Sequence, residues 1–301
     1  MKIRKPAVAG LFYPAEKEKL IELIEWSFKH ELGPGSLPQG EPTGDRMIIA
    51  AQVPHAGYIY SGPAASHIYF SLYYDGKPET VILIGPNHNG IGPGVSVYKG
   101  DAWETPLGIV KIDKEFVEAL LRHSNVFEED ELAHIKEHSI EVQIPFLQYI
   151  YGNNFRIVPI SVWDQGLETA RKIAKAIYEA AMELGRDIVL LASSDMSHYD
   201  PHEETVEKDR EAIIKIEQLD DKGLYDVIYE KNVTMCGYGP VATAINLVKG
   251  IGGKAFTLKY YTSGDISGDK SAVVGYAAIV FTRKMDMGPS GIGKEAEALP
   301  L

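Results

Sequence analysis

Four short segments of the chain place a histidine, an aspartate or a thiol just past an apolar run or in a glycine-rich turn. The segments are Val-Pro-His-Ala-Gly-Tyr at 53–58, Gly-Pro-Asn-His-Asn-Gly at 85–90, Ser-Ser-Asp-Met-Ser-His at 193–198 and Met-Cys-Gly-Tyr-Gly-Pro at 235–240. The apolar runs that precede three of these segments predict buried strands. Because ligands bind outside the carboxyl ends of the strands in an open α/β sheet, we expect the polar side chains of these turns to meet at one edge. They are His55, His88, Asp195 and His198.

His55 and His88 are candidates for metal ligands. Each lies in a turn rich in glycine or proline, and neutral imidazole is the commonest metal ligand in proteins. A single turn histidine is more often bonded to nearby backbone. Two histidines at the ends of separate predicted strands favour a shared metal or acid–base site.

Cys236 is the only cysteine of the chain, so no intrachain disulfide can form. It comes shortly before a predicted helix at 240–249, and a helix N-terminus lowers the pKa of a thiol. The thiolate is the form that binds metal or attacks electrophiles. The alternative is a small buried hydrophobic residue, as many free cysteines are.

Asp195 and His198 follow an apolar run and are candidates for an acid–base pair beside a substrate. The alternative is an aspartate that caps a turn next to an exposed histidine. His134 and His138 are four residues apart, the spacing that places two rings on one helical face. If the helix begins only at 137, the two do not share a face, and His138 is then the better functional candidate.

Apolar runs alternate with helical patterns along the chain, which predicts an α/β protein. Strands are predicted at 47–53, 80–84, 155–162, 187–192, 255–262 and 272–282, with short extended pieces at 95–98 and 108–112. Helices are predicted at 14–30, 63–74, 113–123, 137–149, 167–184, 201–218, 224–230 and 240–249. We expect a single three-layer α/β/α domain over 1–285 with a mainly parallel (mixed) central sheet. Residues 286–301 are expected to form a flexible C-terminal tail.

The composition bounds the class of protein. With 301 residues, of which 45% are hydrophobic, the chain can bury a substantial core. The formal net charge of −12 argues against nucleic acid or an anionic membrane as a partner. No apolar run approaches the ~20 residues of a membrane span, and prolines interrupt the apolar stretch near the N-terminus. We therefore expect a cytoplasmic protein.

Several motifs taken together resemble the signature of the MEMO family. They are Arg-Lys-Pro-Ala-Val-Ala-Gly-Leu-Phe-Tyr-Pro at 4–14, Pro-His-Ala-Gly-Tyr at 54–58 with Tyr-Ser-Gly at 60–62, Gly-Pro-Asn-His at 85–88, Glu-His-Ser-Ile-Glu-Val-Gln at 137–143 with Pro145, Ser-Ser-Asp-Met-Ser-His at 193–198, and Cys-Gly at 236–237. These blocks and the strands predicted after them cover essentially the whole chain.

The resemblance implies a fold similar to that of the LigB-type (class III) extradiol dioxygenases, non-haem iron enzymes that open catechol rings. By position, His55 and His88 match two metal ligands, and Cys236 stands where those enzymes have a glutamate. His138 and His198 match acid–base histidines, with Asp195 beside them. Phe12, Tyr58 and Asn87 are the expected substrate-binding residues.

The implied cofactor is a divalent metal, with Fe(II) favoured and Cu or Zn as alternatives because a thiolate prefers softer ions. The first hypothesis is a metal-dependent redox or oxygen-handling enzyme for a small substrate. The second is a binding module that holds a peptide, a phosphopeptide or a protein partner in the pocket without turnover. A third is a hydrolase with Cys236 as nucleophile and His198 or His138 as base. The family also suggests association with a radical SAM protein and an AMMECR1-like protein.

Overall fold

The computed structural model describes residues 1–283, 286–287 and 293–294. The strands are β1 (Ile3–Arg4), β2 (Ile48–Val53), β3 (Thr80–Pro86), β4 (Val95–Val97), β5 (Ala102–Thr105), β6 (Gly108–Ile112), β7 (Glu128–Glu129), β8 (Arg156–Val162), β9 (Ile188–Ser193), β10 (His198–Asp200), β11 (Lys254–Thr262), β12 (Val273–Thr282), β13 (Asp286–Met287) and β14 (Gly293–Lys294). The helices are α1 (Lys17–Lys29), α2 (Tyr58–Asp75), α3 (Lys114–His123), α4 (Leu132–Ile135), the 3₁₀ helix η1 (Glu141–Gln143), α5 (Ile144–Tyr151), α6 (Leu167–Leu184), α7 (His202–Glu217), α8 (Asp221–Glu230), α9 (Tyr238–Gly250) and α10 (Ser263–Ser267).

One twelve-stranded sheet forms the centre of the molecule. Its order is β1-β5-β6-β8-β3-β9-β2-β12-β10, with β11 on β12, β4 on β8 and β7 on β4. The strands β6, β8, β3, β9 and β2 run parallel. β12 is antiparallel to β2, β11 and β10, and β5 is antiparallel to β6. The sheet is therefore mixed with a parallel core, as the sequence predicts.

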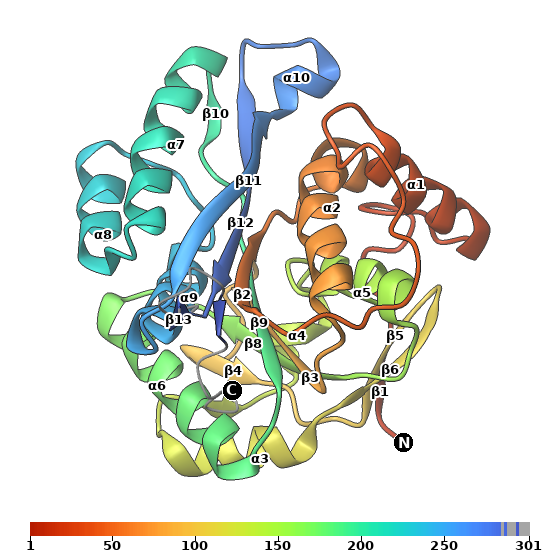
Figure 1. Ribbon diagram of the computed structural model, residues 1–301, viewed down its shortest axis with the longest axis vertical. Coiled ribbons are helices and arrows are strands. Elements are labelled where there is room, and N and C mark those ends of the chain that lie inside the picture. The colour runs from red at the N-terminus through yellow and green to blue at the C-terminus, as the bar shows by residue number, and fades with distance from the viewer. Residues whose placement is uncertain (284–285, 288–292, 295–301) are drawn as a thin grey trace.

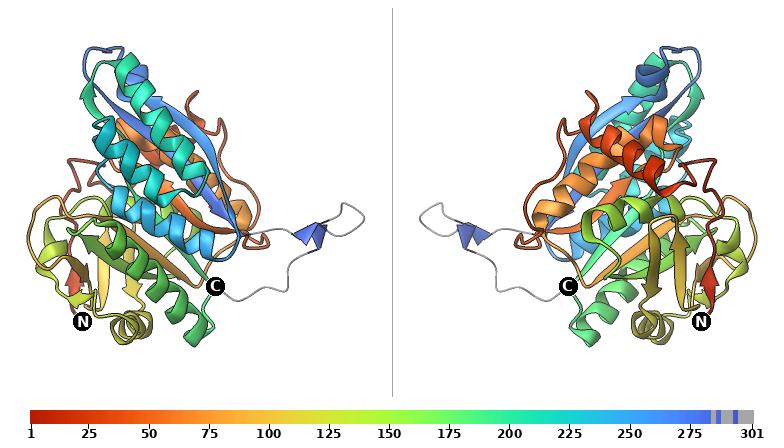
Figure 2. Two further views of the ribbon diagram at one scale, coloured as in Figure 1. Left: turned by 90° about the vertical axis from the view of Figure 1, so that its left-hand side faces the viewer. Right: turned by 90° about the vertical axis from the view of Figure 1, so that its right-hand side faces the viewer.

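The parallel core follows from continuous apolar runs. Every residue of β2, β3 and β9 is buried, and strands buried on both faces require helices on both faces. Helices α1, α2 and α5 cover one face, while α3, α6, α7, α8 and α9 cover the other (Figure 1; Figure 2). The expected three-layer α/β/α architecture is confirmed.

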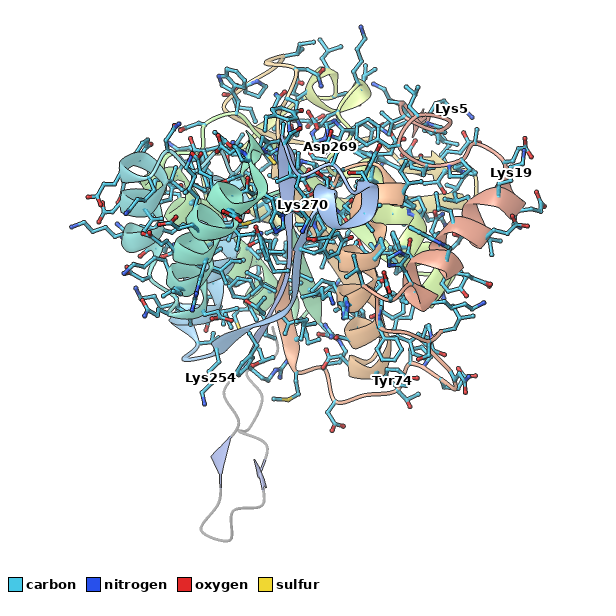
Figure 3. The ribbon with its side chains drawn as sticks, turned by 90° about the horizontal axis from the view of Figure 1, so that it is seen from above. Lys5, Lys19, Tyr74, Lys254, Asp269 and Lys270 are labelled. Atoms are coloured by element: carbon cyan, nitrogen blue, oxygen red, sulfur yellow. The ribbon has the colours of Figure 1, made fainter. Side chains whose placement is uncertain are left out.

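Charged side chains lie mainly at the surface. Lys19 on α1 and Lys254 at the start of β11 extend outward at the periphery of the molecule (Figure 3). The buried carboxylates include Glu137 and Asp195, and both lie beside the cavity described below. Burial of a charge is costly unless it is paired or hydrogen-bonded, so these two carboxylates require an explanation from function or local bonding.

Two predicted helices match the structure closely. The helix α6 has the predicted bounds, and α3 begins after Asp113, whose carboxylate accepts a hydrogen bond from the Phe116 amide at 3.1 Å. Such a cap satisfies one of the unpaired amides at a helix N-terminus.

Five helix starts differ from the prediction by more than one residue. Helix α1 begins three residues later than predicted, and α8 begins three residues earlier. The predicted helix at 137–149 begins only at η1 and continues as α5, which has proline in its first turn. In contrast, α2 begins five residues before Pro63 and α9 two residues before Pro240. A proline near the start of a helix removes few hydrogen bonds, so it marks the helix start only approximately.

None of the helices in the described part of the chain is long and apolar enough to cross a membrane. The predicted tail at 286–301 lies outside the described residues, apart from β13 and β14, which pair with each other in antiparallel fashion.

Candidate metal centre

The carboxyl edge of the parallel strands brings the predicted site together. β2 ends at Val53, β3 at Pro86 and β9 at Ser193. His55, His88 and Asp195 therefore each lie two residues past the end of a strand. The strand order β3-β9-β2 places these ends side by side. Cys236 enters from a different direction, on the segment just before α9.

His55, His88 and Cys236 form a compact set of donors. One potential ligand atom from each lies within 4.8 Å of the others, and Cys236 Sγ is 3.2 Å from His55 Nε2. Donor atoms bound to one ion at about 2.0–2.3 Å lie roughly 3–4.5 Å apart. Three residues that are far apart in the sequence thus have the spacing of one coordination sphere.

The buried carboxylate of Glu137 fixes the ring of His88. Glu137 Oε1 lies 2.8 Å from His88 Nδ1, and Glu137 Oε2 accepts the His88 amide at 2.6 Å. A carboxylate only accepts hydrogen bonds, so His88 Nδ1 carries the proton and Nε2 presents a lone pair. This carboxylate–histidine pairing is the usual support of a metal-binding histidine.

Glu137 remains ionised in spite of its burial. Burial raises the pKa of its carboxyl, but the hydrogen bonds from His88 and the Ser139 amide lower that pKa to about 2. The amides of His138 and Ser139 both donate to Oε1 at 3.0 Å. The segment 137–139 therefore wraps around its own carboxylate and holds it against His88.

A separate chain of hydrogen bonds fixes His55. Gln143 Nε2 donates to the Pro54 carbonyl at 3.0 Å and to Ser193 Oγ at 2.9 Å. Ser193 Oγ donates to the Ser139 carbonyl at 2.6 Å, which uses its single proton. His55 Nδ1, 2.9 Å from Ser193 Oγ, must therefore be the donor in that contact. Its Nε2 is left free to face Cys236.

His198 has the same orientation for a third reason. Its Nδ1 lies 2.9 Å from the Thr234 carbonyl, which can only accept, so the proton is on Nδ1 and Nε2 is free. The His198 amide also donates to Thr234 Oγ1 at 2.7 Å. Three histidines of the site thus have their Nε2 atoms available.

The electrostatic environment of Cys236 differs from the expectation. We expected the N-terminus of α9 to lower the pKa of the thiol. Burial instead raises it strongly, and the negative charge of Asp195 adds to this effect. The hydrogen bond from the Asp195 amide to Sγ at 3.3 Å does not offset these effects. A bound cation would lower the pKa of the Cys236 thiol instead, since a thiol that coordinates a metal ion is deprotonated.

Asp195 supports the loop that carries His55. Its Oδ1 accepts the His55 amide at 2.8 Å, and its Oδ2 lies 3.9 Å from His55 Nε2. Burial raises the pKa of Asp195 to about 6, against the lowering effect of these hydrogen bonds and of the neighbouring histidines. Asp195, His198 and Cys236 also bring potential ligand atoms within 4.8 Å of one another.

His138 lies between the metal-binding candidates and Phe12. Its ring stacks on His88 with centroids 4.5 Å apart, and the Phe12 ring is tilted by 31° against it with centroids 4.4 Å apart. Burial lowers the pKa of His138 to about 4, with Glu137 acting in the opposite direction. The ring is therefore neutral at pH 7 and can accept a proton.

A cavity of about 530 Å³ connects these side chains to solvent. Its lining consists of Phe12, His55, Ala56, Gly57, His88, His138, Asp195, His198, Tyr199, Thr234, Cys236 and Val274. All three predicted ligands and all three predicted acid–base residues line it. Of the predicted substrate-binding residues, only Phe12 does.

The other two predicted substrate-binding residues have structural contacts. Tyr58 is 2% exposed, and its hydroxyl donates to the Val142 carbonyl. The Asn87 side chain donates to the Ile91 carbonyl at 2.8 Å and accepts the Gly90 amide at 3.0 Å. Asn87 therefore shapes the turn that holds His88, and Tyr58 packs in the interior.

Comparisons with known proteins identify the family of the chain. The family model described as Memo-like protein matches residues 4–280. The chain belongs to this Memo-like family. A MEMO1 family protein of Ignicoccus hospitalis is 55% identical over 93% of this chain and 99% of its own length. One of Methanopyrus kandleri is 51% identical with the same coverage. An uncharacterized protein of Escherichia coli K12 of known structure is 14% identical, with a TM-score of 0.47, over 77% of this chain and 99% of its own.

The N-terminal motif of this Memo-like chain is held by a buried ion pair. Arg4 Nη1 lies 2.6 Å from Glu141 Oε2, and both side chains are almost fully buried. Glu141 also accepts the Ala7 and Val8 amides and the Tyr13 hydroxyl, at 2.7–3.0 Å. These bonds fix the segment that brings Phe12 over His138.

The sequence reasoning missed Glu137, Ser193 and Gln143 as members of the site. The signal for two of them was the Memo-like motif at 137–143, where acids and an amide sit among apolar residues. All three residues are buried and do not line the cavity. They belong to the site because their hydrogen bonds orient His55 and His88. His134, by contrast, is fully buried away from the cavity, with Nε2 2.9 Å from Ser96 Oγ.

Proposed function

We propose that this protein holds one divalent metal ion between His55 Nε2, His88 Nε2 and Cys236 Sγ and acts on a small organic molecule in the adjoining cavity. The observation that carries the proposal is the convergence of these donors within 4.8 Å. It is supported by the hydrogen bonds that place the protons of both histidines on Nδ1. Free imidazole nitrogens in this arrangement are what a metal requires.

The donor set decides which ions fit. Imidazole and thiolate suit Fe(II), Cu and Zn, whereas Mg and Ca prefer oxygen donors. We propose Fe(II) as the native ion, with Cu or Zn as alternatives. When bound, such an ion supplies Lewis-acid or redox chemistry at the base of the cavity.

The surrounding residues supply acid–base chemistry. The neutral ring of His138 stands over His88 and can take a proton from a substrate hydroxyl. His198 presents its Nε2 because Nδ1 is held by the Thr234 carbonyl. Asp195 holds the backbone of the His55 loop and its buried carboxyl can exchange a proton with these histidines. The supported reaction class is a metal-dependent redox or oxygen-handling reaction.

Anaerobic reconstitution tests the metal assignment. The metal-free protein is titrated with Fe(II) and, separately, with Zn(II), and bound metal is measured. We expect one ion per chain, with binding lost in His55→Ala, His88→Ala and Cys236→Ala. The matched control is His202→Ala, because His202 bonds to Thr262 Oγ1 and is not part of the cavity lining. Absence of stoichiometric binding, or equal binding by all variants, would overturn the proposal.

Oxygen uptake with a panel of small organic molecules that carry a hydroxyl group then tests turnover by the loaded protein. Catechols are expected to be poor substrates because of the thiolate ligand, and uptake with any member of the panel that depends on His138 and His198 supports the redox assignment. An ion held at full stoichiometry with no substrate turned over across such a panel would favour a binding module instead.

A second candidate rests on one contact. The distance of 3.2 Å between Cys236 Sγ and His55 Nε2 is also that of a nucleophile and its base, with His55 in place of the His198 or His138 expected from the sequence. Burial raises the pKa of the thiol and lowers that of His55 well below its usual value, so both groups are neutral in the metal-free site. This hydrolase candidate would be favoured if iodoacetamide alkylates Cys236 rapidly at pH 7 in the metal-free protein and equally rapidly after metal has been added.

A further inference from the structure

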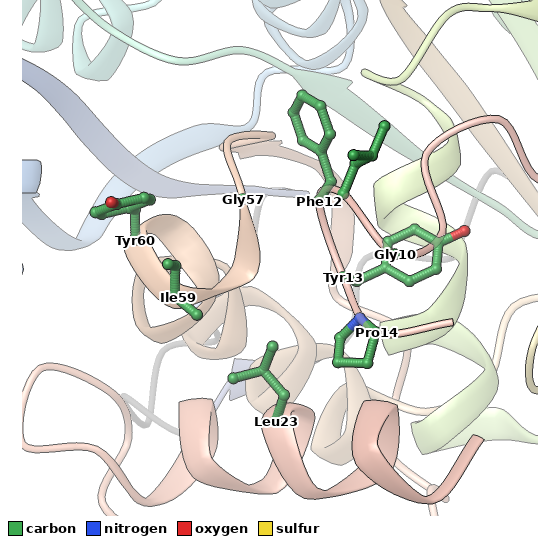
Figure 4. A pocket seen from close by; sticks show the side chains of 9 residues that line it. Gly10, Phe12, Tyr13, Pro14, Leu23, Gly57, Ile59 and Tyr60 are labelled. Carbon is green, nitrogen blue, oxygen red and sulfur yellow. The ribbon is translucent and has the colours of Figure 1, made fainter. Parts of the chain in front are cut away.

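A second hollow adjoins the metal cavity and has a different character. It has a volume of about 450 Å³ and lies between the segment 10–14, the first turn of α2 and Leu23 of α1 (Figure 4). We call it the apolar groove. Its side walls include Leu11, Ile59 and Tyr60, which are 80%, 51% and 40% exposed. Large apolar side chains left this open next to a site are typical of ligand binding.

No side chain that lines the apolar groove carries a charge at neutral pH. This is unusual on a chain with a formal net charge of −12. The hydroxyl of Tyr13, its most buried polar group, is used by Glu141 at 2.7 Å. A ligand in the groove therefore finds apolar surface and few free hydrogen-bonding groups.

Hydrogen bonds hold the walls of the apolar groove in place. The Tyr58 amide donates to the Phe12 carbonyl at 2.9 Å, which ties the segment 10–14 to the start of α2. The buried pair of Arg4 and Glu141 anchors the same segment from the other side. Both walls are thus fixed to the core of the molecule before any ligand arrives.

Phe12 and Gly57 belong to both hollows. Each lines the metal cavity and the apolar groove. The Phe12 ring stands against His138 on the cavity side. Gly57 adds no side chain at this junction. A Cβ there would lie 3.8 Å from the Phe12 carbonyl and 3.9 Å from the Tyr60 ring. Phe12 and Gly57 thus form a shared boundary between the two hollows.

From this adjacency we infer that the substrate has two parts: a polar head that binds at the metal cavity and an apolar alkyl or aryl arm that lies in the apolar groove. The inference rests on the proposed function for the position of the head. The arm needs only apolar contact, and each buried methylene contributes to binding in proportion to its area.

A series of alkyl hydroxamates on the Zn(II)-loaded protein tests the inference. A hydroxamate chelates metal at one end, and its chain can be lengthened from acetyl to octanoyl without changing that end. We expect calorimetry to show affinity rising by about fourfold per methylene until the groove is filled. The readout is binding, so no turnover is needed.

Variants of the walls locate the arm. Leu11→Ser and Ile59→Ser should flatten the dependence on chain length while acetohydroxamate binds as in the wild type. The matched control is Ile109→Ser, because Ile109 is 37% exposed and is not part of the groove lining. Gly57→Ala should selectively weaken the binding of the long chains. The backbone conformation at this position (φ −53°, ψ 141°) suits alanine, and the added methyl stands at the boundary that an arm must pass.

The outcomes separate the two proposals. If the protein does not take up Zn(II), the proposed function fails. If it takes up Zn(II) but does not bind acetohydroxamate, the bound ion accepts no polar head and the inference is overturned. If acetohydroxamate binds but affinity does not depend on chain length, the metal site stands and the apolar groove has no role. A dependence on chain length that survives Leu11→Ser, Ile59→Ser and Gly57→Ala would place the arm elsewhere, toward Tyr199 and Val274, and would also overturn the inference.

Discussion

Glu137 and His88 form a carboxylate–imidazole pair in which Glu137 Oε1 lies 2.8 Å from His88 Nδ1. Glu137 is fully buried, and its pKa of about 2 keeps it ionised throughout the physiological range. The pair holds the ring of His88 in one tautomer and one orientation. The amides of His138 and Ser139 donate to the same carboxylate oxygen and help to keep it in place.

The first prediction concerns this pair. Glu137→Gln keeps the shape of the side chain but removes the charge that favours a metal-bound imidazole. We expect the affinity for Zn(II) to fall about 10–100-fold, as is usual when such an outer partner is lost. Competition with a chromophoric chelator measures it, with the exposed Glu128→Gln as control. Unchanged affinity would show that Glu137 serves only the local fold.

The strands and turns that carry the site can be predicted from the sequence because each depends on the pattern of neighbouring residues. Continuous apolar runs mark the buried parallel strands, and the turns after them hold His55, His88 and Asp195. Since the carboxyl ends of parallel strands share one edge, their convergence follows from fold class alone. The arrival of Cys236 at the same point depends on the family resemblance and not on such a pattern.

The support of the site could not be predicted in the same way. Ser193 and Gln143 are 50 residues apart and meet only in the folded core. Tyr58 and Asn87 stand in site motifs but turn away from the cavity, because motif membership does not fix side-chain direction. The pKa of Cys236 was expected to fall from its place before a helix, and burial, which is a property of the whole fold, reverses the sign.

The second prediction tests the tautomer of His55. Ser193→Ala removes the hydroxyl that accepts from His55 Nδ1. We expect the metal-free variant to show a mixture of the two neutral tautomers, where the wild type shows only Nδ1–H. The nitrogen chemical shifts of the labelled imidazole report this directly. Predominance of Nε2–H in the wild type would contradict the hydrogen-bond assignment.

The third prediction separates ligands from acid–base residues. His198→Ala leaves all three proposed donors in place, so its affinity for Zn(II) should stay within about threefold of the wild type, while any turnover is lost. His88→Ala should lose the metal itself. A loss of metal in His198→Ala as large as that in His88→Ala would make His198 a ligand, and the proposed role would be wrong.

The fourth prediction concerns the thiol. A thiolate prefers softer ions than a carboxylate does, so Cys236→Glu should move the metal preference of the site toward Fe(II). The wild type should retain Zn(II) or copper at least as well as Fe(II), and should cleave catechols poorly or not at all. Metal competition on both proteins measures the ranking. An identical ranking in the two proteins would show that Cys236 does not tune the metal.

The last prediction concerns acid stability and involves His134, which lies away from the metal ligands. Burial, with the charge of Arg4, lowers the pKa of His134 to about 3, from 6.5 for the free side chain. The unfolded chain therefore binds a proton at this residue between about pH 6.5 and 3 that the folded protein does not bind. The contribution of His134 to the free energy of unfolding is therefore fully present above pH 6.5. It is lost as the pH falls below that value, by up to about 1.4 kcal/mol per pH unit.

Urea unfolding of the metal-free protein between pH 7 and 4 measures this slope. His134→Leu and His134→Asn both remove the titrating group, so both should flatten the slope in that range by the same amount. Their stabilities at pH 7 should differ, because only Asn can replace the hydrogen bond to Ser96 Oγ. If the free energy of unfolding has the same pH dependence in the wild type and in both variants, His134 is protonated in the folded protein and the prediction is wrong. If the pH dependence differs between the two variants, it reflects their packing and not the loss of the titrating group.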